Sequence, residues 1–188
     1  VIPIEFEKID MITDVYGKPV GKGYINAYNK KLKKSIIYDL DGNIKVPFKY
    51  SRFGYYKNGF IEAVEYEMFD DEMRGVVGLI DTLGNQILPP KFDNIVEIKS
   101  SRIIVERNGK YGLYDMNNNE IISKKYDNIK FLDDSLVIVS YIRKFGVFDI
   151  KGNQLTEIKY TEIKKSTQPN TIEAYIDKKL FYISIKKN

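Results

Sequence analysis

The chain has 188 residues, of which 43% are hydrophobic and 30% are charged, a composition typical of one soluble globular domain with its own core. The formal net charge of +4 comes from 30 basic and 26 acidic residues, and because these are mixed along the chain, the charge disfavours a nucleic-acid partner. Cysteine and histidine are both absent and no apolar run approaches the roughly 20 residues of a membrane-spanning helix, so we expect no disulfide, no His-containing catalytic triad, no metal, no cofactor and no membrane span.

An aromatic residue near the start of the chain recurs at regular intervals. It stands at Phe6, Tyr50, Phe92, Tyr126 and Tyr160, with separations of 44, 42, 34 and 34 residues. A second marker, in a tight turn, stands at Gly42, Gly84, Asn118 and Gly152, with separations of 42, 34 and 34 residues. Two independent columns with the same spacings predict a tandem repeat architecture.

These spacings predict a single repeat domain that covers residues 1–188. It is divided into a partial unit 1–34, four units at about 35–76, 77–110, 111–144 and 145–179, and a partial terminal unit 180–188. The extra residues of the second unit lie between Tyr66 and Gly75, where we expect a loop on one face. Because the end units are incomplete and the chain begins at Val1, we expect a piece of a longer protein, and the sequence predicts no cellular compartment.

Each unit has the pattern of β-structure, and the third full unit shows it most clearly. Residues 111–116 alternate between aromatic or apolar and other residues, and the asparagines at 117–119 supply the positive φ of a tight hairpin turn. A return strand begins at 120–122, and further strands are predicted at 126–131 and 136–142. No segment has helical periodicity. We therefore predict an all-β tandem array of three- or four-stranded antiparallel meanders, as an open curved solenoid in preference to a β-propeller-like arrangement.

Two further columns of residues have structural roles. Small or β-branched residues stand at Ala27, Ala63, Val105, Val139 and Ala174, where we expect neighbouring units to approach closely. Aspartates precede the turns at Asp39, Asp81, Asp115 and Asp149. A short carboxylate in that place is expected to accept hydrogen bonds from the N–H groups of the turn.

The repeated motifs resemble the bacterial WG repeats, which are also called KWG repeats. The signature position is occupied by Lys110-Tyr111-Gly112 and by Lys144-Phe145-Gly146, the middle motif by residues 87–93 and the last strand by residues 59–64. The resemblance covers nearly the whole chain and is clearest over residues 76–165. It implies a non-catalytic module of a larger bacterial protein.

The chain departs from the WG pattern at the signature residue. The Trp is replaced by Val77, Tyr111 and Phe145, and Phe181 stands where the last unit should have Gly. These changes are compatible with the same fold, but any ligand contact that the family makes through Trp is not carried over to this chain.

The densest aromatic stretch lies at residues 53–60, and in it we select Tyr55, Tyr56 and Phe60 as candidate binding residues. Tyr and Phe beside Gly and Asn can form a recognition patch for a protein loop or a sugar; the alternative is that these rings pack between units. We predict a non-catalytic protein-binding or scaffolding module, with carbohydrate or cell-envelope binding as the second hypothesis. A carboxylate-dependent hydrolase is the third hypothesis. It ranks last because the sequence singles out no pair of carboxylates for such chemistry.

Overall fold

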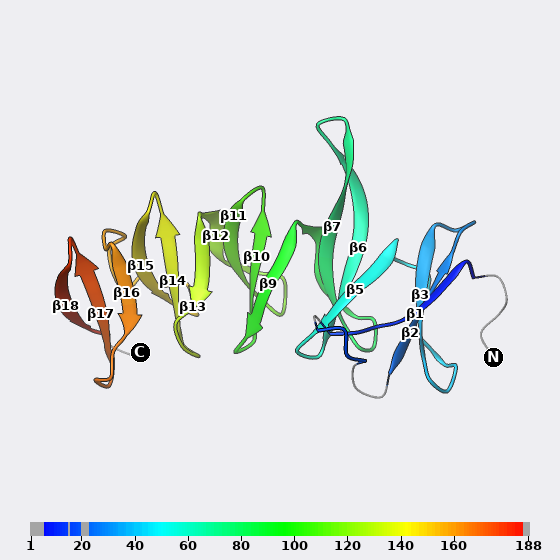
Figure 1. Ribbon diagram of the computed structural model, residues 1–188, viewed down its shortest axis with the longest axis horizontal. Coiled ribbons are helices and arrows are strands. Elements are labelled where there is room, and N and C mark those ends of the chain that lie inside the picture. Colours follow the sequence, from blue (N-terminus) through cyan, green and yellow to red (C-terminus); the bar gives the residue numbers. More distant parts are fainter. Residues whose placement is uncertain (1–5, 15, 20–22, 186–188) are drawn as a thin grey trace. The chain divides into compact units, whose positions relative to one another are not determined.

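The computed structural model describes residues 6–14, 16–19 and 23–185, so the predicted end units 1–34 and 180–188 lie partly outside the described residues. Within those ranges the regular structure is all β-strand, with no helix. The strands form five small antiparallel sheets in which consecutive strands are neighbours (Figure 1). The predicted all-β fold of three- and four-stranded meanders is confirmed, and the choice between an open array and a propeller stays a prediction.

The chain divides into two compact halves, residues 1–95 and 96–188, and the first half contains two four-stranded sheets. The first sheet consists of β1 (Lys8–Met11), β2 (Tyr24–Asn29), β3 (Lys34–Asp39) and β4 (Ile44–Val46); the second consists of β5 (Arg52–Lys57), β6 (Phe60–Phe69), β7 (Glu72–Asp81) and β8 (Gln86–Phe92). Their shared core includes Ile37 and Val46 from the first sheet and Ile61 and Ala63 from the second. All four side chains are buried, and burial of each Ile or Val side chain stabilises the fold by about 1.5–3 kcal/mol.

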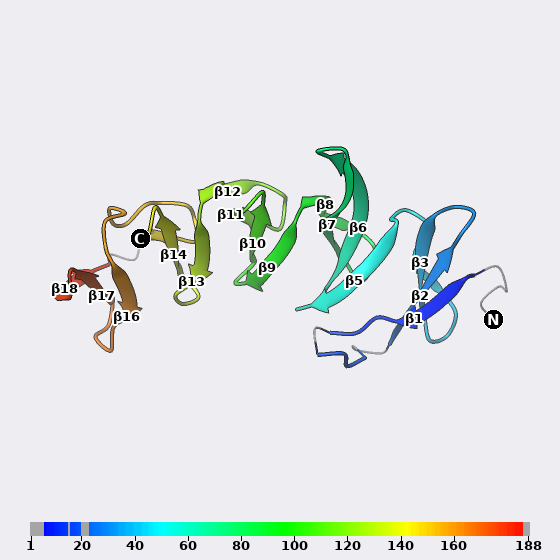
Figure 2. The same cartoon turned by 45° about the horizontal axis from the view of Figure 1, so that its top comes forward.

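Apart from the first two residues of β9, the other three sheets belong to the second half. They consist of β9 (Asn94–Lys99), β10 (Arg102–Arg107), β11 (Lys110–Asp115) and β12 (Glu120–Tyr126); β13 (Asn128–Phe131), β14 (Leu136–Tyr141) and β15 (Lys144–Asp149); and β16 (Glu162–Lys165), β17 (Thr171–Ile176) and β18 (Lys179–Ser184). The middle sheet, β13–β15, lies between the other two (Figure 2). Val137 and Val139 enter the core on one of its faces, and Leu136 and Ile138 enter the core on the other. A strand that is buried on both faces reads as a continuous apolar run, which explains the sequence 136–139.

The chain passes from one sheet to the next at Asp127, so the prediction of a single strand over 126–131 is wrong. Tyr126 ends β12 and Asn128 begins β13, while the amide of Asp127 donates to the Ser140 carbonyl at 2.9 Å. Tyr126 and Ile129 both enter the same core. Residues three positions apart in one continuous strand would face opposite sides, so the break is what allows both side chains to be buried together.

The aspartate column has the structural role that the sequence predicted. In the turn after β11, one carboxylate oxygen of Asp115 accepts hydrogen bonds from the amides of Asn117 and Asn119, at 2.9 and 2.8 Å, and the other accepts one from the Asn119 side chain at 2.8 Å. The turn residue Asn118 has φ 63°. The same arrangement recurs at Asp39, Asp81 and Asp149, each with an Asn four residues later.

The Gly of the signature is required because the fourth strand crosses close over it. A Cβ added at Gly78 would lie 2.5 Å from both the Leu88 carbonyl oxygen and the Pro90 nitrogen of β8, and a Cβ at Gly112 would lie 3.0 Å from the Ile122 carbonyl oxygen of β12. Within the described residues, β18 pairs only with β17. Phe181, which stands in the place of the Gly, pairs with Ala174 of β17.

The extra residues of the second unit form an extension of two strands, which corrects the predicted loop at Tyr66 to Gly75. β6 and β7 pair continuously from Phe60↔Asp81 to Phe69↔Glu72, and Asp70 and Asp71 make the turn at φ 48° and 63°. We name residues 65–76 the arm, which lies beyond the pairing of β5 and β8 and extends beyond β5 in Figure 1. Two long paired strands satisfy their mutual hydrogen bonds, which an irregular loop would leave to water.

An irregular segment replaces the fourth strand of the sheet β13–β15. Two isolated bridges connect it to β15, at Phe148↔Gln154 and Phe145↔Tyr160, and the Val147 carbonyl accepts hydrogen bonds from the amides of Leu155 and Thr156 at 2.9 and 3.3 Å. Between the two bridges the buried Thr156 accepts a hydrogen bond from the Val147 amide through its side-chain hydroxyl, at 2.9 Å. A threonine side chain therefore takes the place of a backbone carbonyl in this ladder.

Candidate binding groove

A groove with a volume of about 740 Å³ lies between the sheets β13–β15 and β16–β18, within the second half of the chain. Its apolar lining comes from Ile138, Phe145 and Ile163, which are part of the core between these two sheets or pack against it. Phe145 occupies the signature position of its repeat and is half-buried. The signature aromatic residue thus provides a partly accessible ring in the groove.

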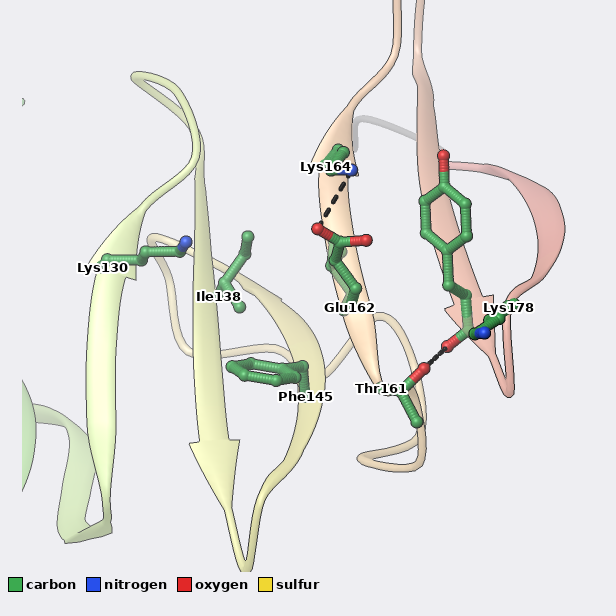
Figure 3. A pocket seen from close by; sticks show the side chains of 9 residues that line it. Lys130, Ile138, Phe145, Thr161, Glu162, Lys164 and Lys178 are labelled. Atoms are coloured by element: carbon green, nitrogen blue, oxygen red, sulfur yellow. Dashed lines mark hydrogen bonds and ion pairs between the residues drawn. The ribbon is translucent and has the colours of Figure 1, made fainter.

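The charged side chains of the groove are predominantly basic. Lys130, Lys164 and Lys178 contribute three positive charges and Glu162 one negative charge, which leaves a net charge of +2 by subtraction. Figure 3 shows Lys130 beside Ile138 on one side and Glu162 with Lys164 on the other. An anionic group that enters the groove therefore meets ammonium groups from three separate elements: β13, β16 and the turn after β17.

The interactions of the three lysines differ. The ammonium of Lys164 lies 3.0 Å from the Glu162 carboxylate and 5.1 Å from the centre of the Tyr175 ring, and the hydrogen bond and charge of Glu162 raise the pKa of Lys164. Lys130 and Lys178 are exposed and form no ion pair among the described residues. Their positive charges are therefore available to a ligand.

Tyr175 is fixed on the far wall of the groove. Its carbonyl accepts hydrogen bonds from the amide of Thr161 at 2.7 Å and from the Thr161 hydroxyl at 3.0 Å, while its own hydroxyl donates to Glu173 at 3.3 Å. Partial removal from water, together with the negative charge of Glu173, raises the pKa of Tyr175. The Tyr175 hydroxyl therefore stays protonated at neutral pH.

The first half contains an equivalent groove of about 370 Å³ between its own two sheets. The pairing registers place Asp10 where the second half has Lys130, and Arg52 where it has Glu162. The buried carboxylate of Glu62 also lines this groove, and it pairs with the Lys57 ammonium at 2.7 Å. The basic character is thus specific to the groove of the second half.

The three residues that the sequence predicted as a binding patch differ in exposure, and their role in binding stays a prediction. Tyr55 is 51% exposed and lines the groove of the first half, whereas Tyr56 is half-buried against the core and Phe60 is half-buried on β6. Glu62 accounts for this arrangement, because its carboxylate lies 2.5 Å from the Cβ position of Gly54 and accepts the Tyr55 amide at 3.2 Å. The resulting irregularity in β5 leaves one ring in solvent and turns the next toward the core.

The sequence contained a signal for the basic groove that the aromatic density concealed. In the first strand of a repeat sheet, the buried motif residue is Ile129 or Ile163, and its polar neighbours point away from the core. Lys130 follows the first of these residues, and Lys164 follows the second. The positions that flank the motif isoleucine are therefore the ones to inspect for ligand contacts in this repeat.

The described residues contain no group of three or more His, Cys, Asp or Glu side chains with an arrangement that could hold a metal ion. In the same part of the chain, no helix has the length and apolar character needed to cross a membrane.

The model of the WG containing repeat matches residues 37–65, 78–111 and 111–141. No match is found among curated proteins. The matched segments carry the turns at Gly42, Gly84 and Asn118 and two of the signature positions. Three successive matches support the same repeat that the spacings predicted.

Similar solved structures include a eukaryotic initiation factor, at 11% identity over 95% of this chain and 55% of that chain, with a TM-score of 0.45. KlHsv2 with loop 6CD replaced by a Gly-Ser linker is 14% identical over 80% of this chain and 56% of that chain, with a TM-score of 0.37. The virginiamycin B lyase from Staphylococcus aureus is 12% identical over 96% and 75%, with a TM-score of 0.32. The chain spans about half the length of the first two, and at these scores none of the three supports a conclusion about function.

Proposed function

The chain belongs to the family of proteins that contain the WG repeat, and from this premise we propose that it is a non-catalytic module that binds an acidic segment of a partner protein. The site is the groove between β13–β15 and β16–β18. The observation that carries the proposal is the combination of an apolar lining with three lysines and one glutamate in a single groove.

The chemistry of the groove supports an acidic peptide with an apolar residue. Carboxylates gain charge-assisted hydrogen bonds from ammonium donors, and Lys130 and Lys178 are exposed for this purpose. An apolar side chain from the same peptide can contact Phe145 and Ile138, and aromatic residues are enriched in protein interfaces. The volume of about 740 Å³ lies within the range of roughly 300–1,000 Å³ that ligand sites occupy.

A non-catalytic role is supported by the acidic groups of the groove. Hydrolysis with two carboxylates needs an acid and a base on opposite sides of the scissile bond, about 5–9 Å apart. Glu162 is the single carboxylate among the groove residues, and the Lys164 ammonium lies 3.0 Å from it. The groove residues therefore offer no second carboxylate to complete such a pair.

A carbohydrate is the second candidate ligand, because one feature of the groove favours it. The rings of Phe145 and Tyr175 line the same groove as the polar groups of Thr161 and Glu162. An aromatic ring can pack against the apolar face of a sugar while neighbouring polar groups form hydrogen bonds with its hydroxyls. The excess of lysine favours a peptide or a sugar that carries carboxylates over a neutral sugar.

The proposal is tested with a fluorescein-labelled peptide in which one Phe stands between two pairs of Asp, which we name the acidic probe. A basic probe with Lys in place of Asp is the control ligand. Fluorescence anisotropy should show binding of the acidic probe only, and the affinity should fall as salt screens the charges. Replacement of Lys130→Glu together with Lys178→Glu should weaken binding at least tenfold, which is about 1.4 kcal/mol.

The matched control is Lys125→Glu, which changes an exposed lysine of the same half on β12, outside the groove. It should leave the affinity for the acidic probe within twofold of the wild type. Equal loss of affinity in Lys125→Glu and in the groove variant would contradict a specific site. Binding of a neutral oligosaccharide that depends on Phe145, without binding of the acidic probe, would favour the carbohydrate candidate instead.

A further inference from the structure

The arm of the first half carries four large apolar side chains that are exposed to solvent. Tyr66 is 49%, Met68 65%, Phe69 43% and Met73 71% exposed. β5 pairs with β6 only as far as Val64, and β8 pairs with β7 only from Val77 onward, so the arm is a two-stranded ribbon. Isolated ribbons of this kind gain little stability by themselves, which makes exposed apolar residues on one a mark of an interaction site.

The two faces of the arm have different chemistry. The alternation of the strands places Tyr66, Met68 and Met73 on one face, where no charged side chain lies between them. On the other face the Arg74 guanidinium binds Glu67 at 2.8 Å and lies 3.8 Å from the centre of the Phe69 ring. The first face is therefore the apolar one, and methionine side chains adapt readily to the shape of a partner.

The tip of the arm is acidic, although its turn does not require acidic residues. Asp70 and Asp71 both have positive φ, at 48° and 63°, and a turn of this type prefers Asn followed by Gly. With Glu72 next to them, three carboxylates stand at the tip, and among the described residues none of the three forms an ion pair. The partner of this tip should be basic.

We propose that the arm docks into the basic groove of a second copy of this chain. The tip offers three carboxylates next to Phe69, Met68 and Met73, and the groove offers three lysines around Ile138 and Phe145. This is the acidic and apolar ligand that the groove was argued to take, so the inference rests on the proposed function. Pairing of one arm with another arm is disfavoured, because it would bring like charges together.

The proposed contact joins two different surfaces of the chain. A contact of this kind is heterologous, and it produces rings when the rotation closes and open chains when it does not. Self-association should therefore increase with protein concentration and decrease with salt, because the attraction is largely between exposed charges. Sedimentation velocity over a wide range of concentrations measures both dependences.

The first test changes the charge of the tip and keeps its turn. Asp70→Asn together with Asp71→Gly produces the Asn-Gly turn, which suits the positive φ values better than the natural pair. This variant should be at least as stable as the wild type, while its self-association should weaken at least tenfold. A folded variant with unchanged self-association would overturn the proposal.

The second test is a charge exchange between arm and groove. Asp70→Lys with Asp71→Lys makes the arm basic, and lysine tolerates this backbone because Lys33 and Lys178 have φ 52° and 68° in the same chain. Lys130→Glu with Lys178→Glu makes the groove acidic. Each variant alone should be monomeric, and an equimolar mixture should associate, because each arm then meets a groove of opposite charge.

The outcomes separate this inference from the proposed function of the groove. If the wild type stays monomeric at high concentration and low salt while the groove still binds the acidic probe, the arm is not the ligand and only the inference is lost. If the probe also fails, the proposed function is lost as well. Sedimentation of the monomer with phosphatidylcholine vesicles, abolished by replacement of Met68 and Met73, would assign the arm to lipid and overturn the inference.

Discussion

The signature glycine of the repeat provides a direct test of the packing, through the substitution Gly78→Ala. The added Cβ would lie 2.5 Å from the Leu88 carbonyl oxygen and from the Pro90 nitrogen, and 2.7 Å from the Pro89 carbonyl carbon. Favourable contacts between carbon atoms lie at about 3.5–4.0 Å, so β8 would have to move by about 1 Å. Because the obstacles are backbone atoms of a strand with two prolines, no side-chain rotation relieves them.

The magnitude follows from two opposing effects. Overpacking costs about 1–3 kcal/mol, while the loss of glycine flexibility in the unfolded chain returns about 0.4–1 kcal/mol. We expect Gly78→Ala to reduce the free energy of unfolding by about 2 kcal/mol. Urea unfolding followed by circular dichroism measures the shift, and an unchanged m-value shows that the change is in stability.

Gly75→Ala is the matched control on the same strand. The nearest atoms to its added Cβ belong to Tyr66 and Val64, both at 3.7 Å, which is ordinary van der Waals contact. It should leave stability unchanged or raise it by up to about 1 kcal/mol. If Gly78→Ala and Gly75→Ala unfold at the same urea concentration, the close crossing of β8 over β7 is refuted as the reason for the signature glycine.

Three further predictions concern the turns, the irregular ladder and the response to acid. Asn119→Ala removes the 2.8 Å hydrogen bond to Asp115 and should cost about 0.5–1 kcal/mol, and a urea midpoint equal to that of the wild type would contradict it. Thr156→Val keeps the shape of the side chain but leaves the Val147 amide without its 2.9 Å acceptor, so unfolding should show a loss of about 1–3 kcal/mol. The side-chain and backbone hydrogen bonds of Asn43 lower the pKa of Asp39 to about 2, below the unfolded value of about 3.9; a lowered folded pKa stabilises the fold above about pH 4, and this contribution is lost as the pH falls toward 2. Urea midpoints measured through this range should fall less steeply in Asp39→Asn than in the wild type.

The strands and turns were predictable because their signals are local. The aspartate that precedes each turn and the Gly or Asn with positive φ lie within five residues of each other, and the side-chain hydrogen bonds form within that span. The break at Asp127 was also contained in the sequence, because Tyr126 and Ile129 are an odd number of positions apart and both are apolar. An uninterrupted strand cannot bury both on one side.

The sequence indicated lysines beside the motif isoleucines, but the groove that brings them together was not predictable, because it depends on packing between sheets. Lys130, Phe145 and Lys164 lie in three different strands, and their proximity appears only when two sheets pack face to face. Aromatic density in the sequence pointed to Tyr55 and Tyr56 instead, but these adjacent residues of β5 face opposite sides, with one ring exposed and the other packed against the core. The periodicity of a sequence predicts which face of a strand is buried, but not which charged side chains of neighbouring sheets come together.

The most direct test of the account is a titration of ¹⁵N-labelled protein with the acidic probe, followed by amide chemical shifts. The account predicts saturable shifts that concentrate on Lys130, Phe145, Thr161, Lys164 and Lys178, with small shifts at Tyr55 and the other residues of the first groove. Lys130→Glu together with Lys178→Glu should abolish them. Shifts that spread evenly over all exposed lysines, or that concentrate outside residues 130–178, would contradict the claim that this groove is the binding site.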